Sequence, residues 1–260
     1  MASSVVVAVA SSAPENDNWV SEENVEWKNG RDKVLVGNSI AKIPEFRHER
    51  RALRLVQYLS RFLAWYTLRT NSPQTTVVQW SKLKANLGLV RKAMRIGKFV
   101  EHFRAAATAY DSKTLDPVIR FCTTGRQLGY GAYMLTDTLT YLDASGVRPS
   151  LAAKKLQVQA YKAWMTGLCF SVLNGVYTIY KSRNEEAAQT DKAVAAEKTV
   201  EVKKLQRERS AAQTQLISDL CDLFIPVSAL GYINVDDGVV GLAGAVSSLI
   251  GLMAQWNKTA

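Results

Sequence analysis

The sequence predicts an all-α protein that associates with a membrane. Apolar side chains recur at helical spacing along most of the 260 residues, and the alternation typical of strands is scarce. Two stretches late in the chain carry no charged residue, although charged residues are frequent elsewhere. Together these observations indicate N-terminal amphipathic helices, followed by one or two apolar C-terminal helices that are candidates to span the membrane.

Composition divides the chain into three regions. Residues 1–44 contain no long periodic stretch and are expected to form a disordered N-terminal tail. Residues 45–150 are basic and helical in pattern. Residues 151–260 contain apolar, membrane-type helices, joined by a charged connector at 184–218 that is rich in good helix formers. The connector is expected to be either one solvated helix or a helical hairpin.

Breaker residues place the ends of the individual helices. Pro73 lies just beyond the first helix, Pro117 begins the third, and Gly146 follows it. The expected helices cover residues 47–69, 79–110, 117–143 and 151–183, and a final apolar, glycine-rich part covers 220–256.

The formal net charge of +10 implies an anionic partner, either an acidic lipid surface or nucleic acid. In the helix expected at 47–69, arginines gather on the side opposite the leucines. In the helix expected at 79–110, a narrow basic stripe faces a wide apolar arc. The stripe consists of Lys84, Arg91, Arg95, Lys98 and His102, and the arc of Leu83, Leu87, Leu89, Val90, Met94, Ile96, Val100 and Phe103.

A helix of this kind can lie in the plane of a bilayer interface, with its apolar arc among the acyl chains and its basic stripe on lipid phosphates. Volume inserted into one leaflet spreads the headgroups and bends the membrane. The ordinary alternative is a helix that buries its apolar face in a bundle and exposes its charges to water. The single acid between Lys82 and Arg104, Glu101, favours the membrane, because solvated faces usually mix charges of both signs.

Two uncharged stretches are candidate membrane spans. Residues 163–180 lie between Lys162 and Lys181, and residues 238–257 follow Asp237. Each is about long enough for a hydrocarbon core of roughly 30 Å. The glycines of the second stretch offer small surfaces for close approach of another helix.

Signatures of catalysis are missing from the sequence. It contains no HExxH, CxxC, P-loop or GxSxG pattern, and its three cysteines lie far apart. We therefore expect no catalytic residue, no cofactor, no metal and no enzymatic role. Helix-turn-helix, zinc-finger, basic-zipper and RNA-recognition signatures are also missing, so a soluble nucleic-acid binder is the third-ranked interpretation and no nucleic-acid partner is expected.

Three runs of residues resemble the peroxin-11 family of peroxisome-proliferation proteins, in its fungal branch. They are RRALRLVQYLSRFLAWY at 50–66, GLVRKAMRIGKFVEHFRAAATAYD at 88–111 and LGYINVDDGVVGLAGAVSSLIGLMAQW at 230–256. Residues 1–44 and 184–218 look individual to this chain.

The resemblance implies a peroxisomal membrane protein that elongates and curves the membrane with its amphipathic helix and so promotes peroxisome fission and proliferation. It implies homo-oligomers and work with fission machinery that includes a dynamin-type GTPase. A pore for small metabolites is the second interpretation. The membrane-binding residues that the resemblance implies, with the apolar residues between them, are Lys84, Leu87, Val90, Arg91, Lys92, Met94, Arg95, Ile96, Lys98, Val100 and Phe103.

Overall fold

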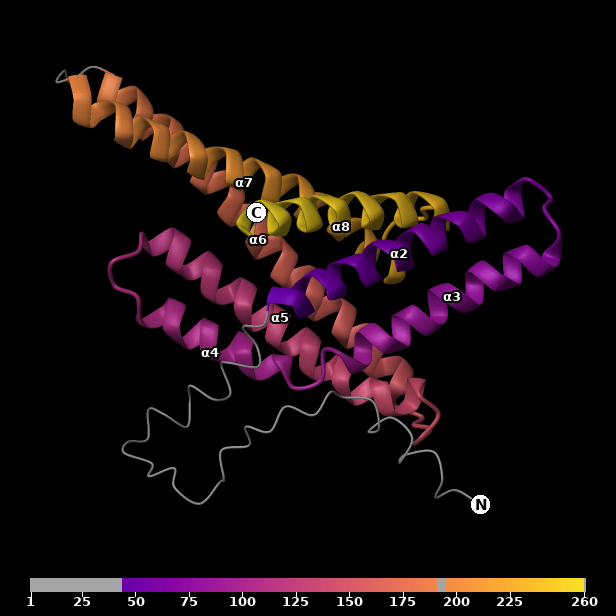
Figure 1. The fold of residues 1–260 in the computed structure, drawn as a ribbon. Helices are drawn as coiled ribbons and strands as arrows, with labels where there is room; N and C mark the ends of the chain where they lie inside the picture. Colours follow the sequence, from indigo (N-terminus) through magenta and orange to yellow (C-terminus); the bar gives the residue numbers. More distant parts are fainter. Residues whose placement is uncertain (1–43, 191–194, 260) are drawn as a thin grey trace, which may run out of the picture. The chain divides into compact units, whose positions relative to one another are not determined.

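The computed structural model describes residues 44–190 and 195–259, and within these ranges the chain forms helices without a strand (Figure 1). The helices are α2 (Pro44–Arg69), α3 (Gln74–Ala93), α4 (Lys98–Asp111), α5 (Pro117–Ala144), α6 (Ala153–Thr190), α7 (Ala195–Ala229) and α8 (Asp237–Thr259). The predicted all-α class is confirmed. The tail predicted at 1–44 lies, up to residue 43, outside the described residues.

The helix predicted at 79–110 is divided into two helices. α3 ends at Ala93, residues 94–97 form a turn, and α4 begins at Lys98. Gly97 has a φ of 80°, a left-handed conformation that costs other residues energy but not glycine. The prediction of one continuous amphipathic helix is therefore wrong. The two parts also have different neighbours, since α3 packs against α2 and α4 packs against α5.

α2, α5 and the start of α6 lie within three residues of the predicted bounds, whereas the final part predicted at 220–256 is divided between the end of α7 and α8. Asp116 caps α5, because its carboxylate accepts a hydrogen bond of 2.9 Å from the backbone N–H of Val118. The connector at 184–218 is a helical hairpin, in which α6 runs to Thr190 and α7 begins at Ala195. The outer halves of these two helices extend beyond the other helices in Figure 1.

The last helix, α8, packs against the first described helix, α2, through glycines. A Cβ on Gly241 would stand 2.8 Å from the backbone nitrogen of Phe62, and one on Gly244 would stand 2.4 Å from the ring of Tyr58. Only residues without a side chain permit so close an approach. The predicted use of these glycines for close helix approach is thus confirmed.

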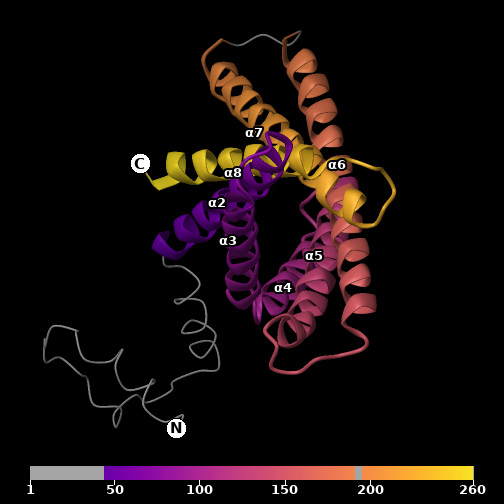
Figure 2. The ribbon, with the colours of Figure 1, turned by 90° about the vertical axis from the view of Figure 1, so that its right-hand side faces the viewer.

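Contacts between neighbours form a closed circuit of helices (Figure 2). α2 contacts α3, α3 contacts α5, and α5, α6, α7 and α8 follow in order until α8 returns to α2. A small apolar core lies within this circuit, where the rings of Tyr133 and Trp164 stack with their centroids 5.2 Å apart beside Leu168 and Val240. The circuit brings the two ends of the described chain together.

Apolar side chains lie outside this bundle and many polar side chains lie inside it. Large apolar residues on every helix from α2 to α8 are exposed, whereas Asp137, Asp219, Asp222 and Ser247 are buried. A water-soluble bundle turns its apolar faces inward, and extended apolar surfaces mark contact with a membrane or another protein. The distribution of side chains therefore fits a membrane environment.

One described helix, α8, is long and apolar enough to cross a membrane, over Asp237–Asn257. Its outward side forms a row of exposed apolar residues: Val239, Leu242, Val246, Leu249, Met253 and Trp256. The other candidate span, residues 163–180, does not meet the same standard of length and composition. It forms the middle of the 38-residue helix α6, where Trp164 and Leu168 are buried in the apolar core.

Candidate functional site

Two rows of basic and polar side chains face each other across the hairpin of α2 and α3. Arg54, Gln57, Tyr58 and Arg61 lie at i, i+3, i+4 and i+7 along α2, which places them on one side of that helix. The opposing row on α3 contains Lys84, Gly88 and Arg91. Gly88 leaves room for Gln57, whose amide nitrogen would stand 3.0 Å from a Cβ at that position.

These rows line a cavity of about 720 Å³ inside the circuit of helices. Its walls come from α2, α3, the 94–97 turn, α5, α6 and α7. Six basic side chains line it: Arg54, Arg61, Lys84, Arg91, Lys92 and Arg95. The carboxylates in the lining are those of Asp137 and Asp222.

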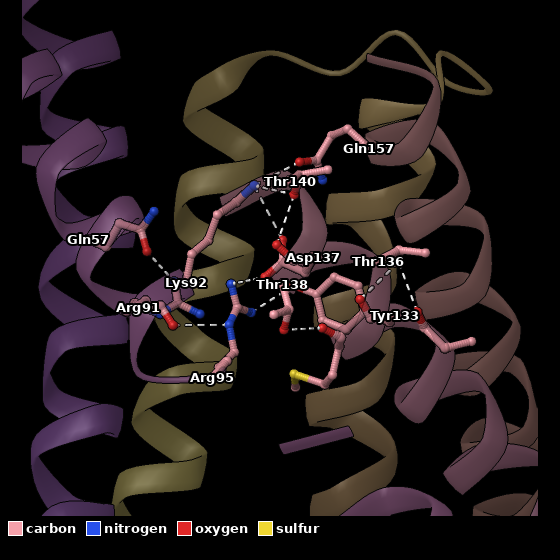
Figure 3. A network of polar contacts seen from close by, with 12 residues as sticks. Gln57, Arg91, Lys92, Arg95, Tyr133, Thr136, Asp137, Thr138, Thr140 and Gln157 are labelled. Atoms are coloured by element: carbon pink, nitrogen blue, oxygen red, sulfur yellow. Dashed lines mark hydrogen bonds and ion pairs between the residues drawn. The ribbon is translucent and has the colours of Figure 1, made fainter. Parts of the chain in front are cut away.

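The carboxylate of Asp137, on α5, pairs with two of these cations (Figure 3). Arg95 Nη2 lies 2.8 Å from Asp137 Oδ2, and Lys92 Nζ lies 3.3 Å from Oδ1. Lys92 also donates to Thr140 Oγ1 at 3.1 Å and to Gln157 Oε1 at 2.8 Å. The Asp137 side chain is 3% exposed, so this pairing lies inside the protein.

Two further carboxylates, from the C-terminal part of the chain, hold the cations of α2. Arg54 donates through Nη2 to Asp222 on α7 and, at 2.9 Å, to Ser247 on α8. Arg61 Nη2 lies 2.6 Å from Asp237 Oδ1, and the other oxygen of Asp237 lies 3.4 Å from Lys84 Nζ. Three carboxylates thus form ion pairs with five of the six cations.

Arg91 is the sixth cation, and no carboxylate within the described residues forms an ion pair with it. Its guanidinium donates to the neutral side-chain oxygen of Gln57 and lies 5.6 Å from the ring centroid of Tyr58. Burial lowers the pKa of Arg91, the charges of Arg95 and Arg54 act in the same direction, and Tyr58 opposes them. Arg91 is therefore the least compensated charge of the cavity.

The predicted membrane-binding residues divide between two sides of α3 and α4. Lys84, Arg91, Lys92 and Arg95 line the cavity, whereas the side chains of Val90, Ile96, Val100 and Phe103 are 38–58% exposed. Leu87, Met94 and Lys98 are half-buried. These four cations thus face the interior of the bundle, and Leu89 of the predicted apolar arc lines the cavity with them.

Three carboxylates of the site, Asp137, Asp222 and Asp237, were not predicted as site residues from the sequence. Asp137 stands as a lone carboxylate among apolar and hydroxyl-bearing residues, and Asp222 forms a pair with Asp219 in an apolar stretch; carboxylates in such surroundings need buried partners. That signal was present in the sequence. The cations that pair with these carboxylates could not be predicted from the sequence, because they lie far away along the chain.

Ligand geometry for a metal is not found at this site. Among residues 44–190 and 195–259, no three His, Cys, Asp or Glu side chains gather closely enough to hold a metal ion. The cavity is instead rich in hydrogen-bond donors. The fold and this site together define a class of protein: an all-helical, membrane-associated bundle with an apolar exterior and a basic interior.

The chain belongs to the Peroxisomal biogenesis factor 11 (PEX11) family, which it matches over residues 48–256. It is 30% identical to peroxisomal membrane protein PMP27 of Saccharomyces cerevisiae, an alignment that covers 80% of this chain and 89% of that protein. Peroxisomal membrane protein PMP30A of Candida boidinii is 27% identical, over 80% of this chain and 88% of the relative. Peroxisomal membrane protein 11A of Homo sapiens is 25% identical, over 78% and 89%.

No solved structure matches this chain. Family membership identifies it as a peroxisomal membrane protein in peroxisome proliferation. The predicted family and location are confirmed. The comparisons name a biogenesis family and do not describe a chemical reaction.

Proposed function

We propose that the protein elongates and curves the peroxisomal membrane by inserting the apolar surface of α3 and α4 into one leaflet, and so promotes peroxisome fission. The observation that carries this proposal is a row of exposed apolar side chains on these helices and the turn between them. The row consists of Leu83, Val90, Ile96, Val100 and Phe103, with exposures of 37%, 46%, 51%, 58% and 38%.

Val90, Ile96 and Val100 are 46–58% exposed and can insert without rearrangement of the bundle, whereas the ring of Phe103 also packs against Gly131 of α5. A buried apolar side chain of this size contributes about 1.5–3 kcal/mol, so a few of them suffice for firm attachment. Lys82 and Arg104 are exposed on the same two helices and are placed to meet lipid phosphates. These two cations, rather than the interior ones, supply the electrostatic part of binding in the closed bundle.

A second step of insertion can involve the interior cations. Arg91, Lys92 and Arg95 reach a lipid surface only if α3 separates from α5, because Asp137 on α5 holds two of them. Such opening costs two buried ion pairs but gains contact with several lipid phosphates. We therefore propose that Arg91, Lys92 and Arg95 contact lipid only in this opened state. The apolar row contacts lipid in both the closed and the opened state.

We further propose a structural rather than enzymatic role, carried out by homo-oligomers that act with fission machinery including a dynamin-type GTPase. Membership of a biogenesis family supports the structural role. The exposed apolar row of α8 supports self-association, since a second copy can pack on it within the bilayer.

The test uses the purified full-length protein and vesicles of graded acidic-lipid content. Binding is followed by flotation, and vesicle shape is followed by electron microscopy. The variant Ile96→Ser with Val100→Ser removes two exposed apolar side chains from the turn and the start of α4. We expect it to lose about 3 kcal/mol of membrane binding, roughly a hundredfold in partitioning, and to form no tubules.

A matched control replaces two apolar residues outside the inserted surface. Val147→Ser with Leu151→Ser makes the same chemical change in the α5–α6 loop, where the side chains are 75% and 105% exposed. This control should bind and tubulate vesicles like the unmodified protein. Equal behaviour of the two double variants would remove the support for insertion through α3 and α4.

A pore for small metabolites remains a second candidate, favoured by the polar cavity within the closed circuit of helices. A pore requires polar groups that face inward, and this cavity supplies them. Flux of a small fluorescent anion across protein-containing vesicles tests it. Flux that is the same in protein-free vesicles argues against conduction.

A further inference from the structure

The charges of the central cavity do not balance. Six Arg and Lys side chains line it, and the carboxylates that pair with them are those of Asp137, Asp222 and Asp237. Asp137 and Asp237 are each shared between two cations. Within the described residues this leaves an excess of three positive charges in a partly buried space, where uncompensated charge is costly.

Two donors in the cavity lining also lack an acceptor. The buried Nε–H groups of Arg54 and Arg61 have no hydrogen-bond partner within the described part of the chain. Each of these guanidiniums donates to its carboxylate through the terminal nitrogen Nη2, so its Nε–H remains available for another acceptor. Buried donors are normally satisfied, so donors of this kind indicate a missing acceptor.

Arg91 faces these arginines from the opposite helix. Arg54 and Arg91 both lie 5.6 Å from the ring centroid of Tyr58, which places both guanidiniums around a single aromatic ring. Arg91 has a neutral partner, Gln57, instead of a carboxylate. An anion next to Tyr58 would therefore meet donors from both rows of the α2–α3 hairpin.

From these observations we propose that the cavity binds a phosphate group, with Arg91 as the central ligand and Arg54 and Arg61 as further donors. Phosphate fits better than a carboxylate for two reasons. It carries up to two negative charges against an excess of three, and its oxygens accept the paired N–H groups of arginine. A cavity of about 720 Å³ accepts a phosphorylated small molecule or a lipid headgroup.

In the closed bundle this site is separate from the membrane-inserted surface of α3 and α4, because its ligands line the cavity and point away from the exposed apolar row. Only in the opened state would Arg91 leave this site and meet the lipid surface. It also does not require conduction through the cavity. A phospholipid headgroup and a free phosphate compound share the recognised chemistry, so the experiment has one arm for each source.

The first arm uses full-length protein, purified in detergent and freed of lipid, and measures thermal unfolding with inorganic phosphate. At a hundredfold excess over Kd, we expect phosphate to raise Tm by about 5–10 °C. Sodium chloride at equal ionic strength should not reproduce this rise. A rise that chloride reproduces in full means screening of charges and overturns the proposal.

The decisive variant is Arg91→Gln. Without added anion it should unfold at a higher temperature than the unmodified protein, because it removes a cation that Arg54 and Arg95 repel. Its affinity for phosphate should fall about tenfold or more. If Arg91 served only to stabilise the fold, Arg91→Gln would instead lower Tm. Lys113→Gln, an exposed position between α4 and α5, is the control and should keep the response to phosphate.

Arg91→Lys provides a second variant that keeps the charge and loses only the planar fork. It should fold like the unmodified protein and bind phosphate roughly tenfold more weakly.

The second arm extracts the protein in mild detergent and measures bound phospholipid by native mass spectrometry. Phospholipid retained by the unmodified protein and lost in Arg91→Gln identifies a headgroup site, and a response to free phosphate alone identifies a soluble ligand. If neither source acts, or if Arg91→Gln responds like the unmodified protein, the proposal is wrong.

Discussion

The guanidinium of Arg95 lies 2.8 Å from the carboxylate of Asp137, and this carboxylate also receives Lys92 at 3.3 Å. One nearly buried acid from α5 therefore fixes two cations that flank the end of α3. The two cations have no other carboxylate partner within the described residues. Asp137 therefore holds the end of α3 against α5, together with Thr140, which accepts from Lys92 at 3.1 Å, and Tyr133, which accepts from Arg95 at 2.7 Å.

We predict that Asp137→Asn lowers the free energy of unfolding by about 3 kcal/mol or more, because removal of one partner leaves buried charges uncompensated. Chemical denaturation in detergent, followed by circular dichroism, measures the loss. Asp236→Asn is the control, since Asp236 pairs with Arg69 while both side chains are more than half exposed. It should change stability by less than about 0.5 kcal/mol. Losses of equal size would contradict the interior role of Asp137.

The turn between α3 and α4 yields a second prediction. Gly97→Ala should destabilise the protein by about 1–2 kcal/mol, because Gly97 has a left-handed backbone and no atom within 4 Å of an added Cβ. The cost thus arises from the backbone alone. Gly175→Ala is the comparison, since Gly175 is helical and an added Cβ would have ordinary contacts at 3.5 Å. It should be neutral or stabilising by up to about 1 kcal/mol. Thermal unfolding of both variants checks the difference in sign.

Asp116 yields a prediction on pH. Desolvation raises the pKa of Asp116, but hydrogen bonds from Lys181, the Val118 N–H and Tyr177 outweigh it and lower the pKa below 3.8. A carboxyl whose pKa is lower in the folded state contributes stability above its unfolded pKa and loses it as pH falls through the folded value. The Tm difference between the unmodified protein and Asp116→Asn should therefore be constant at neutral pH and shrink below about pH 4.

Asparagine keeps the cap at the start of α5, because its side-chain oxygen still accepts from the Val118 N–H. The variant thus isolates the charge of Asp116. Asp111→Asn, an exposed position at the end of α4, should follow the pH profile of the unmodified protein. A Tm difference for Asp116→Asn that is unchanged down to pH 3 would argue against the ion pair with Lys181.

The contact between α8 and α2 yields a fourth prediction. Gly241→Val places a side chain 2.8 Å from the backbone nitrogen of Phe62, which cannot move without shifting α2. We expect a loss of about 2 kcal/mol and faster proteolysis near α2. Leu242→Val changes the neighbouring, exposed position and should leave both unaffected. Normal stability of Gly241→Val would mean that α8 does not pack closely on α2.

The sequence predicted most helices because their signals are local. Pro117 and the capping Asp116 mark the start of α5, and the glycines of α8 indicate a close helix contact. The break at Gly97 was missed, since one glycine within a helical pattern is often tolerated. Periodicity placed Arg91 and Arg95 on one side of the helix. The direction of that side depends on Asp137, whose place beside them follows only from tertiary packing.

The partners of the α2 arginines have a consequence for synthesis of the protein. Arg54 and Arg61 pair with Asp222 and Asp237, which follow 168 and 176 positions later in the chain. A ribosome adds about 5–20 residues per second, so the cations emerge roughly 10–30 s before their anions. The circuit of helices can close only when the last helix has been made. The interior is therefore completed only after α8 has been made, and a chain truncated before α8 keeps Asp222 for Arg54 but leaves Arg61 without Asp237.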